Sequence, residues 1–338
     1  MKPNLYLALV VTFTLLCSTL AITNTAASVT DFSCGDVSEI PQIECEALVT
    51  LYNDTNGDGW ADHTNWLVTN TPSNWFGVTV ESGHISILDL HSNQLSGSIP
   101  PELGDLSNVS WVDLHSNQLG GLIPPELGDM SNLQYFELSS NQLSGSIPAE
   151  LGMLNILQYL NLSDNQLNGS IPPELGDLSS LHYLLLSDNQ LSGLIPTELA
   201  NLSSLQSLGL SSNQLSGPIP PELGNLSSLQ SLNLSSNRLS GSIPPELGDL
   251  SSLLVLRLNH NKLTGDVPDS FVNLVNLYDP GTAWDGGDGL DLDYNHLNVP
   301  PDYPNPANPL HVFLSQKDPD WYLRQTILRL FYLPLLNR

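Results

Sequence analysis

The sequence predicts an α/β repeat solenoid that is capped at both ends. Leucine, asparagine, glycine and proline recur every 24 residues through eight consecutive units, which run from residue 85 to residue 276 without an insertion. An exact period of this length is typical of solenoids, in which each unit packs only against its neighbours. Because no single unit can bury its own leucines, the stacked units must share one continuous core.

The unit at residues 133–156 shows how the pattern predicts each element. Phe136 and Leu138 alternate with polar residues, as expected for a short strand with one buried face. Gly145 and Pro148 then favour a turn. The residues that follow fit a short helical turn whose leucines point back to the core.

An asparagine follows the strand in every unit. The chain turns at this point and leaves backbone groups unpaired inside, and a buried carboxamide can both donate to them and accept from them. We therefore expect a ladder of stacked asparagine side chains. Its members are Asn93, Asn117, Asn141, Asn165, Asn189, Asn213, Asn237, Asn261 and Asn295.

A ninth unit, residues 290–300, is displaced along the chain. Leu290, Leu292 and Asn295 match the strand and the turn of the other units. The insert that precedes them, residues 278–289, contains several glycines and a proline, which predicts a loop.

Both ends of the array need covers, since an open end would expose leucines to water. At the N-terminal end we expect residues 28–84 to form a cap, with a short helix over residues 44–52. Three large rings in this cap are suited to sealing the core, and they are Trp60, Trp66 and Trp75. At the C-terminal end we expect a cap and tail over residues 301–338, with a short helix over residues 309–317.

Residues 1–27 have the pattern of a secretory signal peptide. Lys2 precedes an apolar stretch over residues 5–20, and small residues follow at 25–27. A membrane anchor is the alternative, but the stretch is shorter than the roughly 20 residues that a spanning helix needs. No later segment predicts a membrane span, so we expect a secreted or cell-surface protein.

Two cysteines follow the predicted signal peptide, Cys34 and Cys45. In an exported chain, two cysteines most simply pair, and we expect a disulfide. A metal site is the alternative, but these cysteines have no histidine or further cysteine near them in the sequence.

The charge of the chain excludes several classes of partner. Asp and Glu number 35 against 8 Lys and Arg, for a formal net charge of −27, and residues 3–237 contain no Lys or Arg. A protein that binds nucleic acid needs clustered cations to contact phosphates, so nucleic acid is excluded as a partner. The negative field favours cationic or neutral partners instead.

The repeated unit resembles the plant-type leucine-rich repeat, since it follows the pattern L-x-x-L-x-L-x-x-N-x-L-S-G-x-I-P-x-x-L-G-x-L. This form is found in plant receptor ectodomains and in secreted bacterial proteins. The resemblance implies a curved, right-handed superhelix with parallel strands on the concave face. It also implies short 3₁₀ or helical turns, often a second small strand, and ligand binding on the concave face.

The flanking segments resemble those of the same families. Residues 43–66 and 75–78 are similar to the usual N-terminal cap, which often carries cysteines where this chain has Ser73 and Val80. The resemblance therefore leaves one expected bridge in the cap. Residues 313–321 are similar to the C-terminal flank of secreted bacterial repeat proteins.

One stretch of the N-terminal cap is a candidate cation site. Asp54, Asn56 and Asp58 match the opening of a calcium-binding loop, with oxygen ligands on alternate residues, and Asp62 stands at the ninth position. The twelfth position is Asn65, where such a loop needs a bidentate carboxylate. A plain turn is therefore the alternative, and we expect no other cofactor.

A row of glutamates recurs with the repeat, and its members are Glu102, Glu126, Glu150, Glu174, Glu198, Glu222 and Glu246. Paired catalytic carboxylates need different environments, whereas a periodic row gives every member the same surroundings. We expect a solvated row near the starts of helical turns, where negative charge is favourable. No serine lies in a catalytic context, and the sequence predicts a protein that is not an enzyme.

The expected concave face carries the strongest functional signal. One position per unit holds an aromatic ring in four successive units, and these are Trp111, Tyr135, Tyr159 and Tyr183. The polar residues expected beside this row are Asp113, Glu137, Asn161, His91 and His115. An exposed aromatic row with polar neighbours suits recognition through stacking and hydrogen bonds. The alternative is that the rings only stack on one another across the sheet.

These patterns together predict a secreted, non-catalytic recognition protein. We expect it to bind an extracellular peptide, protein or glycan on the N-terminal half of the concave face, because Ser207 and Ser231 replace the rings further along. A structural surface or matrix protein is the alternative. An inhibitor of an extracellular enzyme is a third hypothesis, which rests on the shared scaffold alone.

Overall fold

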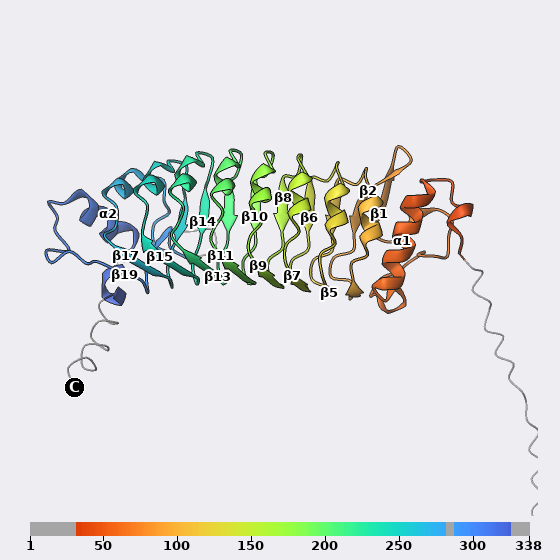
Figure 1. Cartoon of the computed structure of the whole chain (residues 1–338), viewed down its shortest axis with the longest axis horizontal. Helices are drawn as coiled ribbons and strands as arrows, with labels where there is room; N and C mark the ends of the chain where they lie inside the picture. Colours follow the sequence, from red (N-terminus) through yellow and green to blue (C-terminus); the bar gives the residue numbers. More distant parts are fainter. Residues whose placement is uncertain (1–31, 282–286, 326–338) are drawn as a thin grey trace, which may run out of the picture. The chain divides into compact units, whose positions relative to one another are not determined.

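The computed structural model describes residues 32–281 and 287–325. Its contacts divide the chain into residues 1–33 and a compact unit of residues 34–338, which contains all the repeats (Figure 1). The predicted signal peptide, residues 1–27, lies outside the described residues. Among the helices of the described residues, none combines the length and the apolar character needed to cross a membrane.

A ten-stranded sheet runs along one side of the repeat array (Figure 1). Its strands are β1 (Val78–Glu81), β2 (His84–Asp89), β4 (Trp111–Asp113), β6 (Tyr135–Glu137), β8 (Tyr159–Asn161), β10 (Tyr183–Leu185), β12 (Ser207–Gly209), β14 (Ser231–Asn233), β16 (Val255–Arg257) and β18 (Leu290–Asp291). The predicted parallel pairing is confirmed from β2 to β18. The cap adds one strand that the sequence analysis did not predict, since β1 pairs antiparallel to β2 and begins the sheet.

A second sheet of nine short parallel strands lies beside the first one (Figure 1). Its strands are β3 (Ser96–Ser98), β5 (Gln118–Gly121), β7 (Gln142–Gly145), β9 (Gln166–Gly169), β11 (Gln190–Gly193), β13 (Gln214–Gly217), β15 (Arg238–Ser242), β17 (Lys262–Gly265) and β19 (His296–Leu297). Each of β5 to β13 and β17 ends in a glycine. Gly145 has a φ of +77°, a left-handed conformation that favours glycine and turns the chain out of the strand.

A 3₁₀ turn completes each of the eight regular units, and the sequence predicted a short helical turn at these places. They are η4 (Pro101–Asp105), η5 (Pro125–Asp129), η6 (Ala149–Met153), η7 (Pro173–Asp177), η8 (Thr197–Asn201), η9 (Pro221–Asn225), η10 (Pro245–Asp249) and η11 (Asp269–Asn273). A proline precedes every one of them, and the recurring glutamates lie exposed in the first turns, as expected. Successive turns pack closely, because a Cβ added at Gly128 would lie 2.4 Å from the Glu150 carbonyl oxygen. Ala200 stands at the equivalent position of η8.

The leucines of all units form one buried core, and the asparagine ladder lies at its edge. In the central unit, Asn165 Oδ1 accepts a hydrogen bond from the Leu143 amide at 2.9 Å. Asn165 Nδ2 donates to the carbonyl oxygens of Leu138 at 3.0 Å and Leu162 at 3.2 Å. The same bonds recur in other units, through Asn295 of the displaced ninth unit, so the predicted ladder is confirmed. From Asn117 onward, each carboxamide therefore joins its own unit to the unit before it, whereas Asn93 joins the first unit to the cap.

The N-terminal cap is held by a helix, a disulfide and a cluster of rings. Helix α1 (Gln42–Asp54) extends the predicted helix at both ends, and the predicted Cys34–Cys45 disulfide is formed. The predicted Trp60, Trp66 and Trp75 are all buried, and each indole N–H donates to a backbone carbonyl of the cap. Three short turns, η1 (Cys34–Asp36), η2 (Gly57–Gly59) and η3 (Pro72–Asn74), complete it.

The C-terminal cap contains helix α2 (Pro309–Lys317), with the bounds that the sequence predicted. The Asn308 side chain caps this helix by accepting a hydrogen bond from the Leu310 amide at 2.9 Å. Lys317 Nζ then donates to the Leu277 carbonyl oxygen at 2.6 Å and pairs with Asp279 at 2.7 Å, which ties the cap to the last units.

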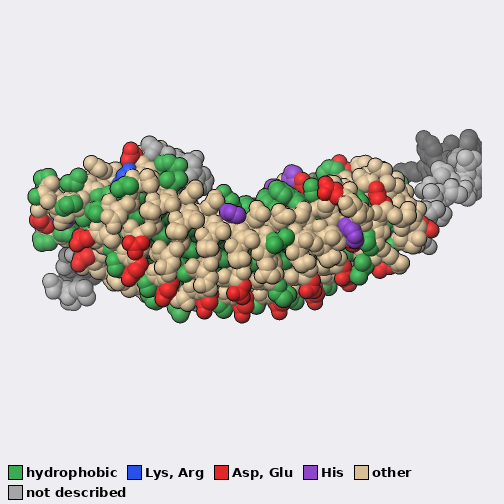
Figure 2. All heavy atoms as spheres, turned by 90° about the horizontal axis from the view of Figure 1, so that it is seen from above, with side chains coloured by type: hydrophobic (Ala, Val, Ile, Leu, Met, Phe, Trp, Pro, Cys, Tyr) green, Lys and Arg blue, Asp and Glu red, His purple; other side chains and the backbone are tan. Residues whose placement is uncertain are grey.

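Within this repeat-containing unit, the side that carries the ten-stranded sheet is hollowed, and Asp and Glu side chains line the opposite, convex side (Figure 2). The ten-stranded sheet is therefore the concave face that the resemblance implied.

Candidate functional site

The predicted aromatic row exists and spans four strands of the concave sheet. Strand register sets Trp111, Tyr135, Tyr159 and Tyr183 next to one another. Ring centroids are 3.5 Å apart between Trp111 and Tyr135, with the planes within 5°, and 4.4 Å apart between Tyr135 and Tyr159, with the planes within 11°. The Tyr183 ring is tilted by 45° from the Tyr159 ring, at 5.7 Å.

This stacking decides how the row can meet a ligand. The faces of the inner rings are covered by neighbouring rings, as in the alternative interpretation of the row, so a ligand meets mainly ring edges. Trp111 and Tyr183, at the two ends, stay 38% and 39% exposed. Recognition by stacking on the inner rings is thereby disfavoured, whereas apolar contact with ring edges and hydrogen bonding to hydroxyl groups fit the geometry.

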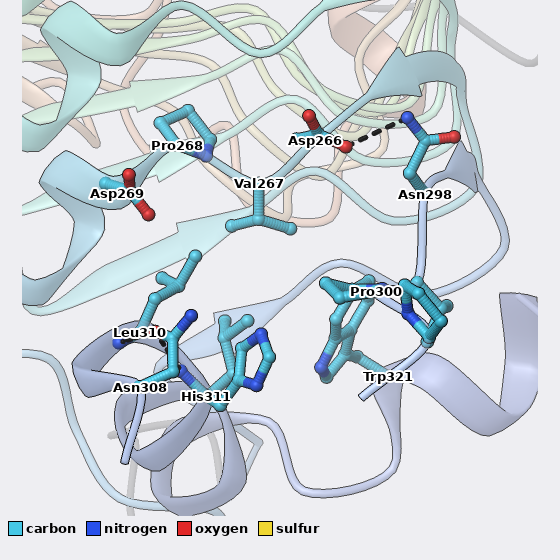
Figure 3. A pocket seen from close by; sticks show the side chains of 13 residues that line it. Asp266, Val267, Pro268, Asp269, Asn298, Pro300, Asn308, Leu310, His311 and Trp321 are labelled. Atoms are coloured by element: carbon cyan, nitrogen blue, oxygen red, sulfur yellow. Dashed lines mark hydrogen bonds between the residues drawn. The ribbon is translucent and has the colours of Figure 1, made fainter. Parts of the chain in front are cut away.

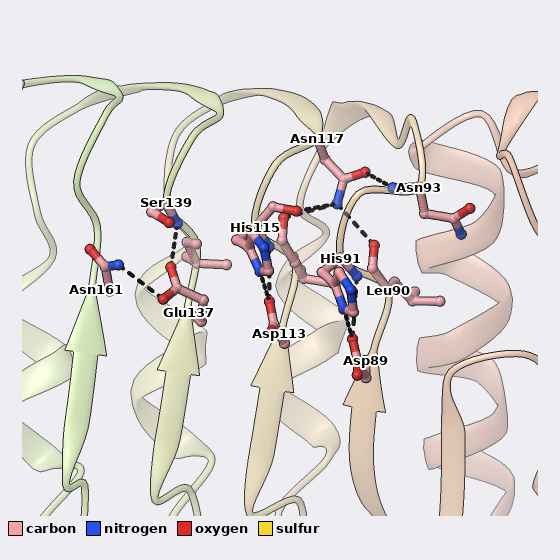
Figure 4. Close-up of polar contacts among 12 residues, drawn as sticks. Asp89, Leu90, His91, Asn93, Asp113, His115, Asn117, Glu137, Ser139 and Asn161 are labelled. Atoms are coloured by element: carbon pink, nitrogen blue, oxygen red, sulfur yellow. Dashed lines mark hydrogen bonds and ion pairs between the residues drawn. The ribbon is translucent and has the colours of Figure 1, made fainter.

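The two carboxylates predicted beside the aromatic row, those of Asp113 and Glu137, are buried. Glu137 is only 5% exposed, and its carboxylate accepts hydrogen bonds from Asn161 Nδ2 at 2.9 Å and the Ser139 amide at 2.9 Å (Figure 4). It also accepts one from Tyr159 Oη at 3.0 Å. Burial raises the pKa of Tyr135 to about 12, and burial together with the Glu137 carboxylate also raises the pKa of Tyr159. Both tyrosines are therefore protonated donors at neutral pH.

The two predicted histidines lie at the N-terminal end of the row, and each is paired with an aspartate. His91 Nδ1 lies 2.5 Å from Asp89 Oδ1, and His115 Nδ1 lies 2.7 Å from Asp113 Oδ1 (Figure 4). The hydrogen bond to Asp89 raises the pKa of His91. Asp113 is buried, so its carboxylate is bonded to His115 and is not itself exposed to a ligand.

A second row of polar side chains was missed by the sequence analysis. A shallow groove of about 420 Å³ runs along the aromatic row, and its polar wall is formed by Ser110, Gln134, Gln158, His182 and Gln206. Each of these residues immediately precedes the first residue of its strand. The alternation of buried and exposed side chains holds only within a strand, so it does not predict which way these side chains point. Tyr183 Oη donates to Gln206 Oε1 at 3.2 Å, so the groove extends into the unit in which Ser207 replaces the aromatic ring.

Two carboxylates of the candidate calcium loop, those of Asp58 and Asp62, accept hydrogen bonds within the cap. Asp58 Oδ1 accepts a hydrogen bond from Tyr52 Oη at 2.8 Å, and Asp62 Oδ1 accepts one from the Thr64 amide at 2.9 Å. The Asp62 backbone also holds Asn93, the first member of the ladder. Asp54 lies at the end of α1, and Asn56 Nδ2 lies 3.4 Å from Ser96 Oγ. The contacts within the cap thus give this segment a structural role.

A separate cavity of about 590 Å³ lies between the last regular unit and the C-terminal cap (Figure 3). Val267, Leu310 and Leu314 form its apolar wall, and Asp266 and Asp269 lie at its polar side. Trp321, which is fully buried, also lines it, and its indole N–H has no partner among the described residues.

An acidic cluster lies at the C-terminal end of the concave sheet. Carboxylate oxygens of Asp291, Asp293 and Asp318 lie within 4.8 Å of one another, and Arg324 pairs with Asp293. Burial raises the pKa of Asp318 to about 8 and, together with the charge of Asp288, raises the pKa of Asp291 to about 6. This cluster therefore takes up protons in a range where ordinary carboxyl groups are ionised.

Comparisons with known proteins agree with the repeat geometry. A family model described as "Leucine-rich repeat region" matches residues 95–240, and one described as "Leucine Rich Repeat" matches residues 252–274. No curated protein matches the chain.

Solved structures give three informative matches. The leucine-rich repeat ectodomain of the Arabidopsis thaliana receptor kinase GASSHO1/SCHENGEN3 is 36% identical, with a TM-score of 0.68 over 75% of this chain and 30% of that one. The ectodomain of the Arabidopsis receptor kinase HAESA is 32% identical, with a TM-score of 0.64 over 75% of this chain and 41% of that one. A plant ice-binding protein is 26% identical, with a TM-score of 0.62 over 77% of this chain and 88% of that one.

The chain spans about a third of the length of the first receptor structures that it matches. The receptor ectodomains named above were solved in complex with CASPARIAN STRIP INTEGRITY FACTOR 2 and with an IDA peptide hormone, respectively. These matches agree with the exact repeat, with the parallel strands that recur in both sheets and with the 3₁₀ turns. The chain is a leucine-rich repeat protein, and its solenoid resembles the ectodomains of plant leucine-rich repeat receptors.

Proposed function

We propose that this protein is a non-catalytic, extracellular binding protein whose ligand is an extended peptide segment, free or part of a larger protein. The ligand would lie along the groove on the N-terminal half of the concave sheet. The observation that carries the proposal is that two rows of side chains run side by side along the groove. One is the aromatic row, which offers ring edges and hydroxyl groups, and the other is the polar wall, which offers mainly glutamine amides. An extended peptide offers apolar side chains to the first row and backbone amide groups to the second.

The stacked geometry favours a peptide over a glycan as the ligand. Sugar rings pack on the open faces of aromatic side chains, and the inner faces of this row are covered. The glutamine side chains at Gln134, Gln158 and Gln206 each offer both a donor and an acceptor, as the peptide backbone requires. The solved complexes of the matching plant receptors with peptide hormones support the same class of ligand. The disulfide supports an extracellular location.

Selection from a displayed random-peptide library, run in parallel with a glycan array, tests the proposal on the full chain. We expect the chain to select peptides, and the variant Trp111→Ala with Tyr183→Ala to bind them at least about 30-fold more weakly, since exposed aromatic anchors are typical binding hot spots worth about 2 kcal/mol or more. The matched control is Ser207→Ala with Ser231→Ala, which changes the same concave position in the later units.

Two results would overturn the proposal. Selected peptides that bind the aromatic variant as tightly as the parent would place the ligand elsewhere. Binding to glycans with no peptide selected would replace the peptide by a sugar as the ligand class. Thermal melts of both variants separate lost binding from lost folding, because both exposed rings can be removed without opening the leucine core.

A further inference from the structure

Two histidine–aspartate pairs repeat in successive units of the concave sheet. Asp89 is the last residue of β2, and His91 follows it two residues later. Asp113 and His115 occupy the same positions at the end of β4, one unit further along. The two imidazole rings are parallel, with planes within 2° and centroids 4.9 Å apart. The repeat therefore presents two imidazoles side by side in the same orientation (Figure 4).

The carboxylates fix which nitrogen of each ring is available. In both pairs it is Nδ1 that lies at hydrogen-bonding distance from the aspartate, so in the neutral ring Nδ1 carries the hydrogen and Nε2 keeps its lone pair. The two nitrogens lie on different sides of an imidazole ring, and Nε2 is not used in these bonds. The side chains of His91 and His115 are 49% and 34% exposed, so solvent reaches the site.

We propose that Nε2 of His91 and Nε2 of His115 together bind one transition-metal ion of the class that prefers imidazole, such as Zn²⁺, Cu²⁺ or Ni²⁺. One ring nitrogen of His91, one of His115 and a carboxylate oxygen of Asp113 lie within 4.8 Å of one another. Bonds of about 2.0–2.1 Å from zinc to nitrogen require the two Nε2 atoms to lie within about 4 Å. Because the two ring planes are parallel, each ring must also turn toward the other until both lone pairs point at one ion, and the partial exposure of the two side chains leaves room for this turn.

Asp89 and Asp113 are positioning residues in this site. Metal-bound histidines generally donate their second ring N–H to a carboxylate, which orients the ring and raises its basicity, and both histidines make this bond here. Water, or a carboxylate of a bound ligand, completes the coordination. The net charge of −27 draws cations to the protein, and the imidazole pair selects transition metals over calcium and magnesium.

Titration calorimetry of Zn²⁺ into the full chain, in excess Ca²⁺ to occupy ordinary carboxylates, tests the proposal. We expect one Zn²⁺ equivalent, and its affinity should fall at least about 10-fold in His91→Ala and in His115→Ala, because even loss of a supporting carboxylate typically costs about 10–100-fold. Asp89→Asn should weaken binding by about 10-fold while both nitrogen ligands remain. The matched control is His182→Ala, which removes a single imidazole from the same face.

A spectroscopic readout on the unmodified chain makes the test independent of any variant. Electron paramagnetic resonance of the chain with one equivalent of Cu²⁺ should show coupling to two equivalent imidazole nitrogens. A spectrum without nitrogen coupling would contradict the proposal. So would an equal Zn²⁺ affinity in the double variant His91→Ala, His115→Ala and in the control His182→Ala. Neither result bears on peptide binding, since no peptide is present in these experiments.

Discussion

The two caps close the same solenoid in different ways. In the N-terminal cap, the indole N–H groups of Trp60, Trp66 and Trp75 all reach a carbonyl, and a disulfide holds the chain. In the C-terminal cap, Trp321 Nε1 and Gln325 Oε1 are buried without a partner among the described residues, and the acidic cluster lies beside them. Burying apolar surface is thus enough to close an end, but satisfying the buried polar groups takes additional residues.

The largest expected difference between the caps is their response to pH. The folded pKa of Asp318, about 8, lies above the ordinary value of 3.8, so the stability that this group contributes is complete below about pH 4 and is lost as the pH rises to about 8. The loss is on the order of 5 kcal/mol, from about 1.36 kcal/mol per pKa unit. Asp318→Asn keeps an acceptor for the Leu292 amide and should remove this dependence.

Hydrogen exchange of the Leu292 amide and denaturant unfolding at pH 4, 6 and 8 measure the effect. The control, Asp249→Asn, changes an exposed carboxylate at the end of a 3₁₀ turn and should leave the pH dependence as it is. Equal pH profiles for Asp318→Asn and the parent would show that Asp318 does not cause the pH dependence and would remove the contrast.

The next effect in size concerns the buried charge at the C-terminal end. Asp293 is 2% exposed and pairs with Arg324, so Arg324→Ala leaves a buried carboxylate without its cation. Removing one partner of a fully buried pair costs about 3–5 kcal/mol, and because the Arg324 side chain is 39% exposed the expected loss is smaller, about 2 kcal/mol. We expect this loss in denaturant unfolding at pH 7, with little loss in the control Arg238→Ala, whose side chain is exposed. A loss below 1 kcal/mol would contradict the role given to Arg324.

The smallest effect compares one indole from each cap. Trp66→Phe removes the donor to the Phe76 carbonyl oxygen, whereas Trp321→Phe removes a donor that has no partner among the described residues. Both substitutions remove similar volume from a buried ring, so their difference isolates the hydrogen bond. We expect Trp66→Phe to cost about 1 kcal/mol more in the free energy of unfolding, the usual net value of such a bond. Equal costs would indicate that Trp321 is satisfied in solution.

Much of the fold could be predicted from the sequence because every unit repeats the same residue pattern and therefore packs in the same way. The ladder through Asn295, the helix over residues 309–317 and the Cys34–Cys45 bridge all followed from period, turn residues or cysteine count. Strand β1 escaped prediction because it lies outside the repeat and pairs antiparallel across a short turn.

The candidate site was harder to predict than the fold. The aromatic row followed from alternation, but the burial of Glu137 depends on contacts with Tyr159 and Asn161 in the next unit. The polar wall of the groove, which includes Gln134, is formed by residues just before each strand, and the alternation within strands does not predict where their side chains point. Ring orientation also depends on neighbouring units, so the sequence did not show that the inner ring faces are covered.

The glycine in most of the 3₁₀ turns has a consequence for the bending of the molecule. At Gly128 or Gly176 a methyl group would collide with the following turn, 2.4 Å from its carbonyl oxygen. Ala200 carries that methyl group, and η8 and η9 accordingly approach each other less closely than most neighbouring turns do. We therefore expect the extra carbon to hold these two turns apart, so that substituting these positions would adjust the curvature, and with it the breadth of the hollow, unit by unit.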